Sequence, residues 1–189
     1  KKGDLILIVS PSGSILPEYI ERSSKVLEDW GFQVKIGKHA RKKHGRYAGS
    51  TEERIEDFQW AINHQKAKAI LCARGGYGAI QLVDKINLSA LKKHPKWLIG
   101  FSDITIFHSL FNQANIPSIH ASMSKHLSES LATNESIFYL KNMLTETTPN
   151  YQIATHPLNR EGNTTGILTG GNLSILYSLR GTPYELNTK

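Results

Sequence analysis

The amino-acid sequence predicts an α/β fold, with an open, mainly parallel sheet and helices on both faces. The first observation is that short apolar runs alternate with segments whose apolar residues recur at helical spacing, as in parallel sheets. The second is composition: 189 residues, of which 39% are hydrophobic and 21% charged, can bury the core of a soluble globular domain.

The first part of the chain sets this pattern. The apolar run 5–9 is a strand that ends at a Pro- and Gly-containing turn, and a helix begins at Pro17 and stops before Gly31. A second strand follows at 33–36. Ser50 and Glu53 then have the spacing of a capping box at the start of a helix.

The alternation continues to about residue 145. The third and fourth apolar runs each lead through glycines into a helix, and one more strand and helix complete the unit. In chain order, strands are predicted at 5–9, 33–36, 69–73, 97–101 and 116–120, and helices at 17–30, 50–64, 77–85, 104–113 and 134–144.

The character of the sequence changes after residue 145. Pro149, Pro157 and Gly162 lie among polar residues, which predicts a linker. A new apolar unit with a helix at 172–179 follows. We therefore expect an α/β domain over 1–145, a linker over 146–165 and the incomplete start of a second domain over 166–189.

The net charge of +7 makes nucleic acid a partner to consider. Much of the excess lies in residues 35–46, a glycine-flanked basic stretch with one aromatic residue, Tyr47, at its end. It is predicted to be a solvated loop, and nucleic acid is not predicted as a partner. His39 and His44 have no carboxylate or thiol nearby in sequence, so neither a metal nor another cofactor is predicted.

The single cysteine, Cys72, excludes an internal disulfide and fits a reducing compartment. Its place at the end of an apolar run predicts a small buried side chain. No apolar run approaches the roughly 20 residues that span a bilayer, and no secretory signal is visible. We expect a cytoplasmic protein without a membrane partner.

The most informative motif is Gly100-Phe101-Ser102-Asp103, after the fourth predicted strand. A sharp turn through Gly-x-Ser holds the hydroxyl at the edge of the sheet, where it can attack a carbonyl while backbone N–H groups bind the oxyanion. A serine helix cap produces the same pattern and, on this motif alone, is the better reading. The second glycine of the usual motif is replaced by Ile104.

A glycine cluster, Arg74-Gly75-Gly76-Tyr77-Gly78, follows the third predicted strand. Its amides could complete an oxyanion hole or bind a phosphate, although it is neither a P-loop nor a dinucleotide fingerprint. Because the carboxyl ends of parallel strands share one edge, several candidate residues should converge there. They are Ser12, Gly76, Ser102 and His120.

These motifs together resemble the LD-carboxypeptidase family, serine peptidases that include muramoyltetrapeptide carboxypeptidase and the microcin C immunity peptidases. The combination of Arg-Gly-Gly-Tyr-Gly with a later Gly-x-Ser-Asp is specific. The resemblance implies a Rossmann-like N-terminal domain. It runs in order through residues 3–13, 47–54, 69–78, 99–105 and 170–173.

The resemblance implies that Ser102 is the nucleophile and that the backbone N–H groups of Gly76 and Asp103 form the oxyanion hole. It also implies metal-free cleavage between an L-centre and a terminal D-residue, typically D-alanine of a murein tetrapeptide from cell-wall turnover. A homodimer is suggested as well. The candidate substrate-binding residues are Ser12, Arg74, Tyr77 and His120.

The family's triad is Ser-Glu-His, and its glutamate and histidine are expected beyond residue 189, so little activity is predicted for this chain alone. His108 lies nearly two turns after Ser102 and should point elsewhere. His120 is interpreted as structural or site-lining, and Asp103 as a helix N-terminal acid. Gln81 departs from the family's arginine, and residues 119–123 depart from its His-Gly-Pro-Met.

Two alternatives remain open. The same machinery could cleave peptidyl or aminoacyl nucleotides, which an affinity of the basic stretch near Lys42 for phosphate would favour. A non-catalytic anion-binding module would instead tolerate Ser102→Ala. The third residue of a murein peptide, lysine or diaminopimelate, is also left open by the sequence.

Overall fold

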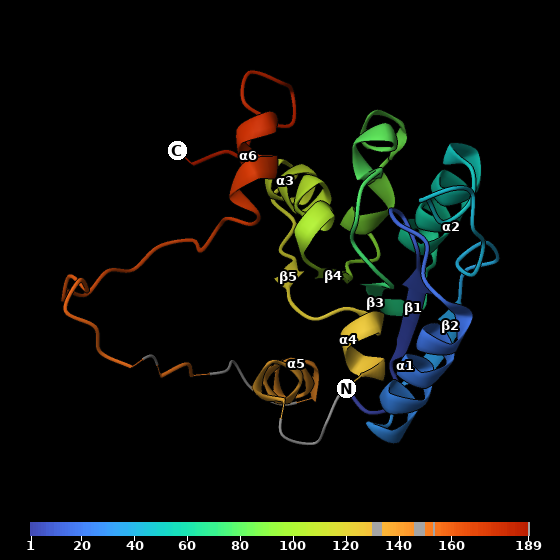
Figure 1. Ribbon diagram of the computed structural model, residues 1–189, viewed down its shortest axis with the longest axis horizontal. Coiled ribbons are helices and arrows are strands. Elements are labelled where there is room, and N and C mark those ends of the chain that lie inside the picture. Colours follow the sequence, from blue (N-terminus) through green and yellow to red (C-terminus); the bar gives the residue numbers. More distant parts are fainter. Residues whose placement is uncertain (130–133, 146–149, 153, 189) are drawn as a thin grey trace.

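The computed structural model describes residues 1–129, 134–145, 150–152 and 154–188. Within them, five strands form one parallel sheet in the order β2-β1-β3-β4-β5 (Figure 1), so the predicted fold class is confirmed. The order reverses at β1, and α/β proteins bind ligands beside such a switch point. The strands are β1 (Leu5–Val9), β2 (Gln33–Ile36), β3 (Ala67–Cys72), β4 (Trp97–Gly100) and β5 (Ile119–His120).

Helices cover both faces of the sheet, as predicted (Figure 1). The side chains of β1 alternate between two cores, with Leu7 in one and Ile8 in the other, because successive residues of a strand point to opposite faces. Buried residues of α2 (Thr51–Asn63) and α3 (Thr105–Gln113) complete the first core. The second core is completed by α1 (Pro17–Asp29), α4 (Ser124–Ser128) and α5 (Glu135–Thr145).

The start of α2 is fixed by the predicted capping box. The Ser50 hydroxyl accepts the backbone N–H of Glu53 at 3.3 Å, and the Glu53 carboxylate accepts the backbone N–H of Ser50 at 2.9 Å. Two N–H groups that the helix itself cannot satisfy are thereby paired.

The predicted helix over 77–85 is wrong. Its place is taken by two short 3₁₀ turns, Ala79–Gln81 and Val83–Lys85. Gly78 has a φ of 130°, which no helix allows. The last strand is also shorter than predicted, because Pro117 has no N–H to offer a neighbouring strand.

The C-terminal segment returns to the body of the protein at α3. The helix α6 (Leu173–Ser178) has Asn172 as its N-cap, and the backbone N–H of Asn172 is donated to the hydroxyl of Thr105, 3.0 Å away. Leu179 is buried in the first core. The described residues between 150 and 171 form neither helix nor strand, while predicted linker residues 146–149 and 153 lie outside the described ranges.

Two expectations drawn from composition concern burial. Cys72 is fully buried at the end of β3, as predicted, and this burial raises the pKa of its thiol. In the part of the chain that the structure describes, no helix is both long and apolar enough to cross a membrane.

Candidate active site

The backbone at Ser102 is bent into a conformation that serine rarely adopts. Its φ is 61°, and it opens a 3₁₀ turn, Ser102–Ile104, that links β4 to α3. Such a conformation costs a residue with a side chain about 1 kcal/mol or more, and it persists where the surrounding structure enforces it. The strand–turn–helix context expected for a nucleophilic serine is therefore present.

The glycine loop, residues 75–78, packs directly against this turn. A Cβ added to Gly75 would lie 3.1 Å from the Ser102 Cβ and 3.4 Å from the backbone nitrogen of Asp103. Gly76 has a φ of 119°, another conformation that requires glycine. The backbone N–H of Gly13 donates to the Gly75 carbonyl at 3.0 Å, which joins this loop to the one after β1.

The side chains of Ser12 and Asp103 meet beneath the glycine loop. Ser12 is fully buried and donates its hydroxyl to the Asp103 carboxylate. The same carboxylate accepts the backbone N–H of Ala79 at 3.0 Å. The Ser12 hydroxyl therefore has an internal partner rather than a solvent-facing position, and the Asp103 side chain bridges loops rather than only starting a helix.

Sequence reasoning assigned no role to Arg54, which the structure places behind the same loops. Its side chain is 1% exposed, and it donates to the carbonyls of Pro11 and Gly78 at 3.1 and 3.0 Å. It also donates to the side-chain oxygen of Gln81 at 2.6 Å. Gln81 is the position at which many members of the resembled family carry an arginine, so in this chain that position accepts a hydrogen bond from Arg54. The signal available was an arginine four residues before Phe58, on the buried side of α2.

Three other predicted residues lie on the exposed rim of the candidate site, around the Ser102 turn and the glycine loop. Arg74 is exposed and donates to the Ser14 carbonyl at 2.7 Å, and Tyr77 is half exposed. His120 is exposed at the end of β5, where it pairs in register with Gly100. Because β4 lies between β3 and β5, the turn at Ser102 lies between the glycine loop and His120.

His108 is engaged elsewhere, as predicted. One ring nitrogen, Nε2, lies 2.9 Å from the Gly100 carbonyl, and Nδ1 lies 2.7 Å from the Ser118 hydroxyl. A carbonyl only accepts, so Nε2 carries the proton. Burial lowers the pKa of His108 to about 4, which keeps the ring neutral. Among the described residues, the Ser102 hydroxyl has no hydrogen-bond partner.

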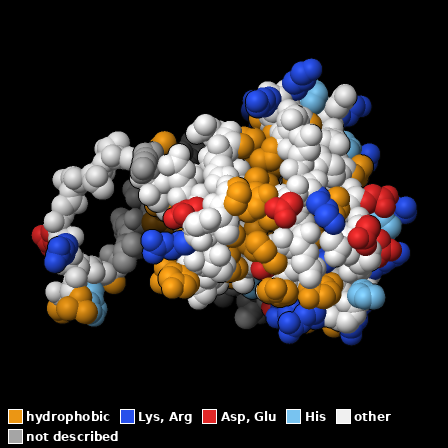
Figure 2. All heavy atoms as spheres, turned by 90° about the horizontal axis from the view of Figure 1, so that it is seen from above, with side chains coloured by type: hydrophobic (Ala, Val, Ile, Leu, Met, Phe, Trp, Pro, Cys, Tyr) orange, Lys and Arg blue, Asp and Glu red, His pale blue; other side chains and the backbone are white. Residues whose placement is uncertain are grey.

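Several cations of the basic stretch, residues 35–46, are paired with glutamates in the folded protein. Lys38 pairs with Glu56, Arg41 with Glu21, and Lys42 with Glu53. On the face that Figure 2 shows, lysines and arginines lie mainly toward the margins with acidic side chains among them. This arrangement does not form a continuous basic surface on that face.

The expectation that His39 has no carboxylate near it is wrong in space. Its Nε2 lies 2.9 Å from Glu56, and its Nδ1 lies 3.7 Å from Glu53, because α2 brings both glutamates to the loop. Even so, within the described ranges no three His, Cys, Asp or Glu side chains are arranged to hold a metal ion.

Comparison with known sequences agrees with this geometry. Residues 6–121 match the family described as the LD-carboxypeptidase N-terminal domain. The whole chain is 34% identical to a probable murein peptide carboxypeptidase of Bacillus subtilis, of which it covers 60%. Over 94% of its length it is 30% identical to the murein tetrapeptide carboxypeptidase of Pseudomonas aeruginosa, and it again covers 60% of that protein.

Solved structures show the same arrangement. An MccF-like protein from Bacillus anthracis matches with a TM-score of 0.86 and 26% identity, over 100% of this chain and 65% of that one. A muramoyltetrapeptide carboxypeptidase from Oxalobacter formigenes matches with a TM-score of 0.85 and 25% identity, over 97% of this chain and 62% of that one. This chain thus spans about 60% of the length of the curated relatives it matches.

Proposed function

Because the chain belongs to the LD-carboxypeptidase family, we propose that it supplies the nucleophile of a serine carboxypeptidase that removes a terminal D-residue from an L,D-peptide. The observation that carries this proposal is the strained Ser102 turn packed against Gly75. An ordinary helix cap needs neither a positive φ nor a glycine loop in contact with the serine.

In the proposed reaction, the Ser102 hydroxyl attacks the carbonyl carbon of the scissile amide, and the base takes its proton. The oxyanion accepts the backbone N–H groups of Gly76 and Asp103. When the C–N bond breaks, the base returns the proton to the departing amine, and an ester on Ser102 remains. Water then hydrolyses that ester and regenerates the hydroxyl.

The base and its acid partner are proposed to lie beyond residue 189. In this proposal residues 1–145 form the nucleophile-bearing domain, 146–165 a linker, and 166–189 the start of the domain with the glutamate and histidine of the triad. The contact between Asn172 and Thr105 supports it, because it ties the C-terminal segment to the helix that begins three residues after Ser102.

Substrate contacts are proposed at the rim. The exposed Arg74 can pair its guanidinium with the carboxylate of the terminal D-residue. The exposed side chains of Tyr77 and His120 are proposed to contact the substrate peptide on either side of Ser102. The names of the two bacterial relatives support a murein peptide, and that of the Pseudomonas aeruginosa relative supports a tetrapeptide. We propose D-alanine as its terminal residue. We place the enzyme in the cytoplasm, as a homodimer acting on peptides from cell-wall turnover without a nucleic-acid or membrane partner.

A second candidate is cleavage of peptidyl or aminoacyl nucleotides by the same residues. The match to an MccF-like protein favours it. The two substrates would differ on both sides of the scissile amide, but an amide would be cleaved in each case, so Ser102 would have the same role in both.

The test uses the full-length protein that carries these residues, as wild type, Ser102→Ala and Ser89→Ala. Ser89 is an exposed serine on a 3₁₀ turn, so it serves as the matched control. Each protein is incubated with a murein tetrapeptide, and released D-alanine is measured by mass spectrometry. We expect loss of the nucleophile to slow release by about 10³-fold or more, with the control unchanged. The isolated 189-residue chain should release little.

Each alternative has its own outcome. Release of D-alanine that survives Ser102→Ala would refute the role of this serine. The second candidate would be selected by two results together. The wild type releases no D-alanine, and it cleaves an aminoacyl sulfamoyl nucleoside or a peptidyl nucleotide only when Ser102 is present. Anion binding that is insensitive to Ser102→Ala would favour the non-catalytic module.

A further inference from the structure

Three loops from different strands meet at the carboxylate of Asp103. Ser12 belongs to the loop after β1, Ala79 ends the glycine loop after β3, and Asp103 itself follows Ser102 after β4. The three residues are 0%, 0% and 3% exposed, respectively. This carboxylate is therefore an internal junction at the carboxyl edge of the sheet.

The junction places a buried carboxylate among uncharged partners. No described salt bridge includes Asp103, and its two hydrogen-bond donors are an uncharged hydroxyl and a backbone amide. Burying an ionised carboxylate is costly unless hydrogen bonds and charges compensate it. The guanidinium of Arg54 on the other side of the loops supplies a favourable field, although it makes no direct contact with the carboxylate.

We propose that the Asp103 carboxylate is a positioning residue that holds the glycine loop in register with Ser102. Building on the proposed function, its hydrogen bond to Ala79 fixes the end of the loop whose Gly76 N–H receives the oxyanion. The backbone nitrogen of Asp103 is the other proposed donor, so one residue both supplies a donor and aligns its partner. Because Gly75 packs closely on Ser102, a shift of the glycine loop would also displace Ser102 or open a gap beside it.

The size of the expected effect follows from the geometry of such sites. A displacement of about 1 Å in a catalytic group can cost about 10²-fold in rate. Arg54 separately binds the Pro11 and Gly78 carbonyls, so the loops stay attached when the Asp103 carboxylate is removed. An asparagine oxygen could still accept from Ser12 and Ala79, so the informative variant is Asp103→Ala. We expect it to fold and to lose catalytic rate rather than substrate affinity.

The experiment compares Asp103→Ala, Ser12→Ala and Asp57→Ala with the wild-type full-length protein. Asp57 is the matched control, because its carboxylate is also buried and accepts a backbone N–H, that of His39 at 2.9 Å, but away from the glycine loop. Three quantities are measured: kcat and KM for D-alanine release, the labelling rate of Ser102 by a fluorophosphonate, and hydrogen exchange in residues 74–82. Labelling forms an O–P bond and releases fluoride, and the phosphoryl oxygen occupies the oxyanion site.

We expect Asp103→Ala to lower kcat and the labelling rate by about 10- to 100-fold with KM within about threefold, and to speed exchange of the loop amides. Ser12→Ala, which keeps the carboxylate but removes one donor, should change the same quantities less. Asp57→Ala should leave all three within about twofold, even where it lowers the melting temperature.

Several outcomes would overturn the proposal. If Asp103→Ala turns over and is labelled at the wild-type rate, the carboxylate does not position the loop. The same holds if loop exchange is unchanged, or if Asp57→Ala has an equal effect. Failure of the proposed function is separate: a wild type that is labelled at Ser102 but releases no D-alanine refutes that substrate and still tests Asp103. If no labelling occurs either, loop exchange alone decides.

Discussion

The two ends of the sheet each contain a buried cation with no carboxylate partner, and they use it differently. Before β4, Lys96 is 4% exposed and donates to the Ile62 and His94 carbonyls at 2.8 and 3.0 Å. At the carboxyl end, Arg54 is 1% exposed and joins the loops after β1 and β3. Lys96 links the end of α2 to the segment before β4, whereas Arg54 links two of the loops that form the candidate site.

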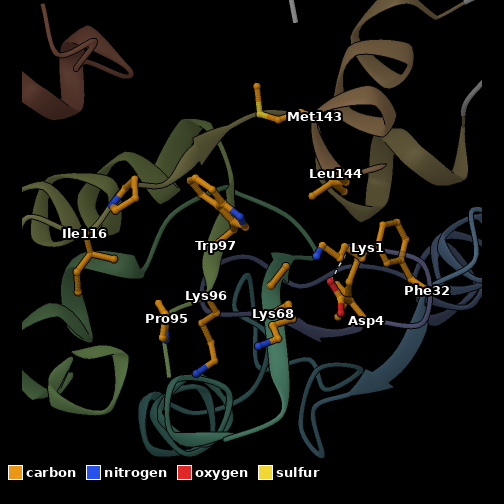
Figure 3. Close-up of a pocket in the computed structure, with 13 residues that line it drawn as sticks. Lys1, Asp4, Phe32, Lys68, Pro95, Lys96, Trp97, Ile116, Met143 and Leu144 are labelled. Carbon is orange, nitrogen blue, oxygen red and sulfur yellow. Dashed lines mark hydrogen bonds and ion pairs between the residues drawn. The ribbon is translucent and has the colours of Figure 1, made fainter. Parts of the chain in front are cut away.

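Cavities lie at both ends of the sheet. One of about 330 Å³ at the carboxyl end has Phe101 and His120 among its lining residues. Another of about 330 Å³ at the amino end has Trp97 and Ile116 among its lining residues (Figure 3). The Lys96 amine points away from Trp97 in this view and toward the carbonyls that it binds. No strained nucleophile or glycine loop borders this cavity. The comparison teaches that convergent polar groups on constrained backbone, rather than hollow space, mark the candidate active site.

The largest expected effect concerns Arg54. Arg54→Met leaves two buried carbonyls and a glutamine without their donor, so it should lower the free energy of unfolding by about 3 kcal/mol. Arg41→Met is the control, because Arg41 forms an exposed pair with Glu21 and should cost less than about 1 kcal/mol. Urea unfolding measures both. Equal costs would remove the distinction between a bridging cation and a surface one.

A smaller, pH-dependent effect is expected at Lys96. Burial lowers the pKa of Lys96 from 10.5 to about 8, so between these values the unfolded state binds more protons than the folded one. Wild-type stability should therefore rise, relative to Lys96→Met, as the pH increases from 8 toward 10.5, by at most about 1.4 kcal/mol per pH unit. Below pH 8 the difference should be flat.

Urea unfolding of both proteins at pH 7, 8.5 and 10 checks this sign. A difference that stays constant across the range would mean that the Lys96 amine is hydrated in the folded protein. A difference that moves in favour of Lys96→Met would contradict the direction of the pKa change.

The smallest expected effect compares two residues at positive φ. Ser102 at 61° lies at the carboxyl end, whereas Asn115 at 56° ends α3 at the amino side, where asparagine is well tolerated. Ser102→Gly should stabilise the protein by about 0.5 to 1 kcal/mol while abolishing turnover. Asn115→Gly should gain only a few tenths of a kcal/mol. A stability loss on Ser102→Gly would show that the serine turn is not strained.

The sequence predicted the elements that depend on local patterns. The five strands followed from apolar runs, and the start of α2 followed from Ser50 and Glu53. The 77–85 helix is wrong because Gly78 adopts a φ of 130°, in a loop that Asp103 and Arg54 hold through the Ala79 N–H and the Gly78 carbonyl. The charge pairing of the basic stretch was missed for a similar reason, since Glu53 and Glu56 approach it only after α2 is folded.

The residues of the candidate site also fall into two groups, those predictable from local motifs and those that depend on tertiary contacts. Ser102 and the glycine loop were predicted from motifs whose backbone requirements can be read locally. Arg54 and the Ser12–Asp103 contact depend on loops from three strands meeting, which no spacing in the sequence encodes. The extents of the linker and second domain remain predictions.

The burial of Cys72 has a practical consequence. A thiol that is enclosed in the core with its pKa raised presents almost no thiolate to oxidants or alkylating reagents. This chain should therefore behave chemically as if it had no cysteine. A cysteine introduced at an exposed position such as Tyr177 would accept a fluorescent or spin label alone, and could report how α6 moves relative to α3 without any background substitution.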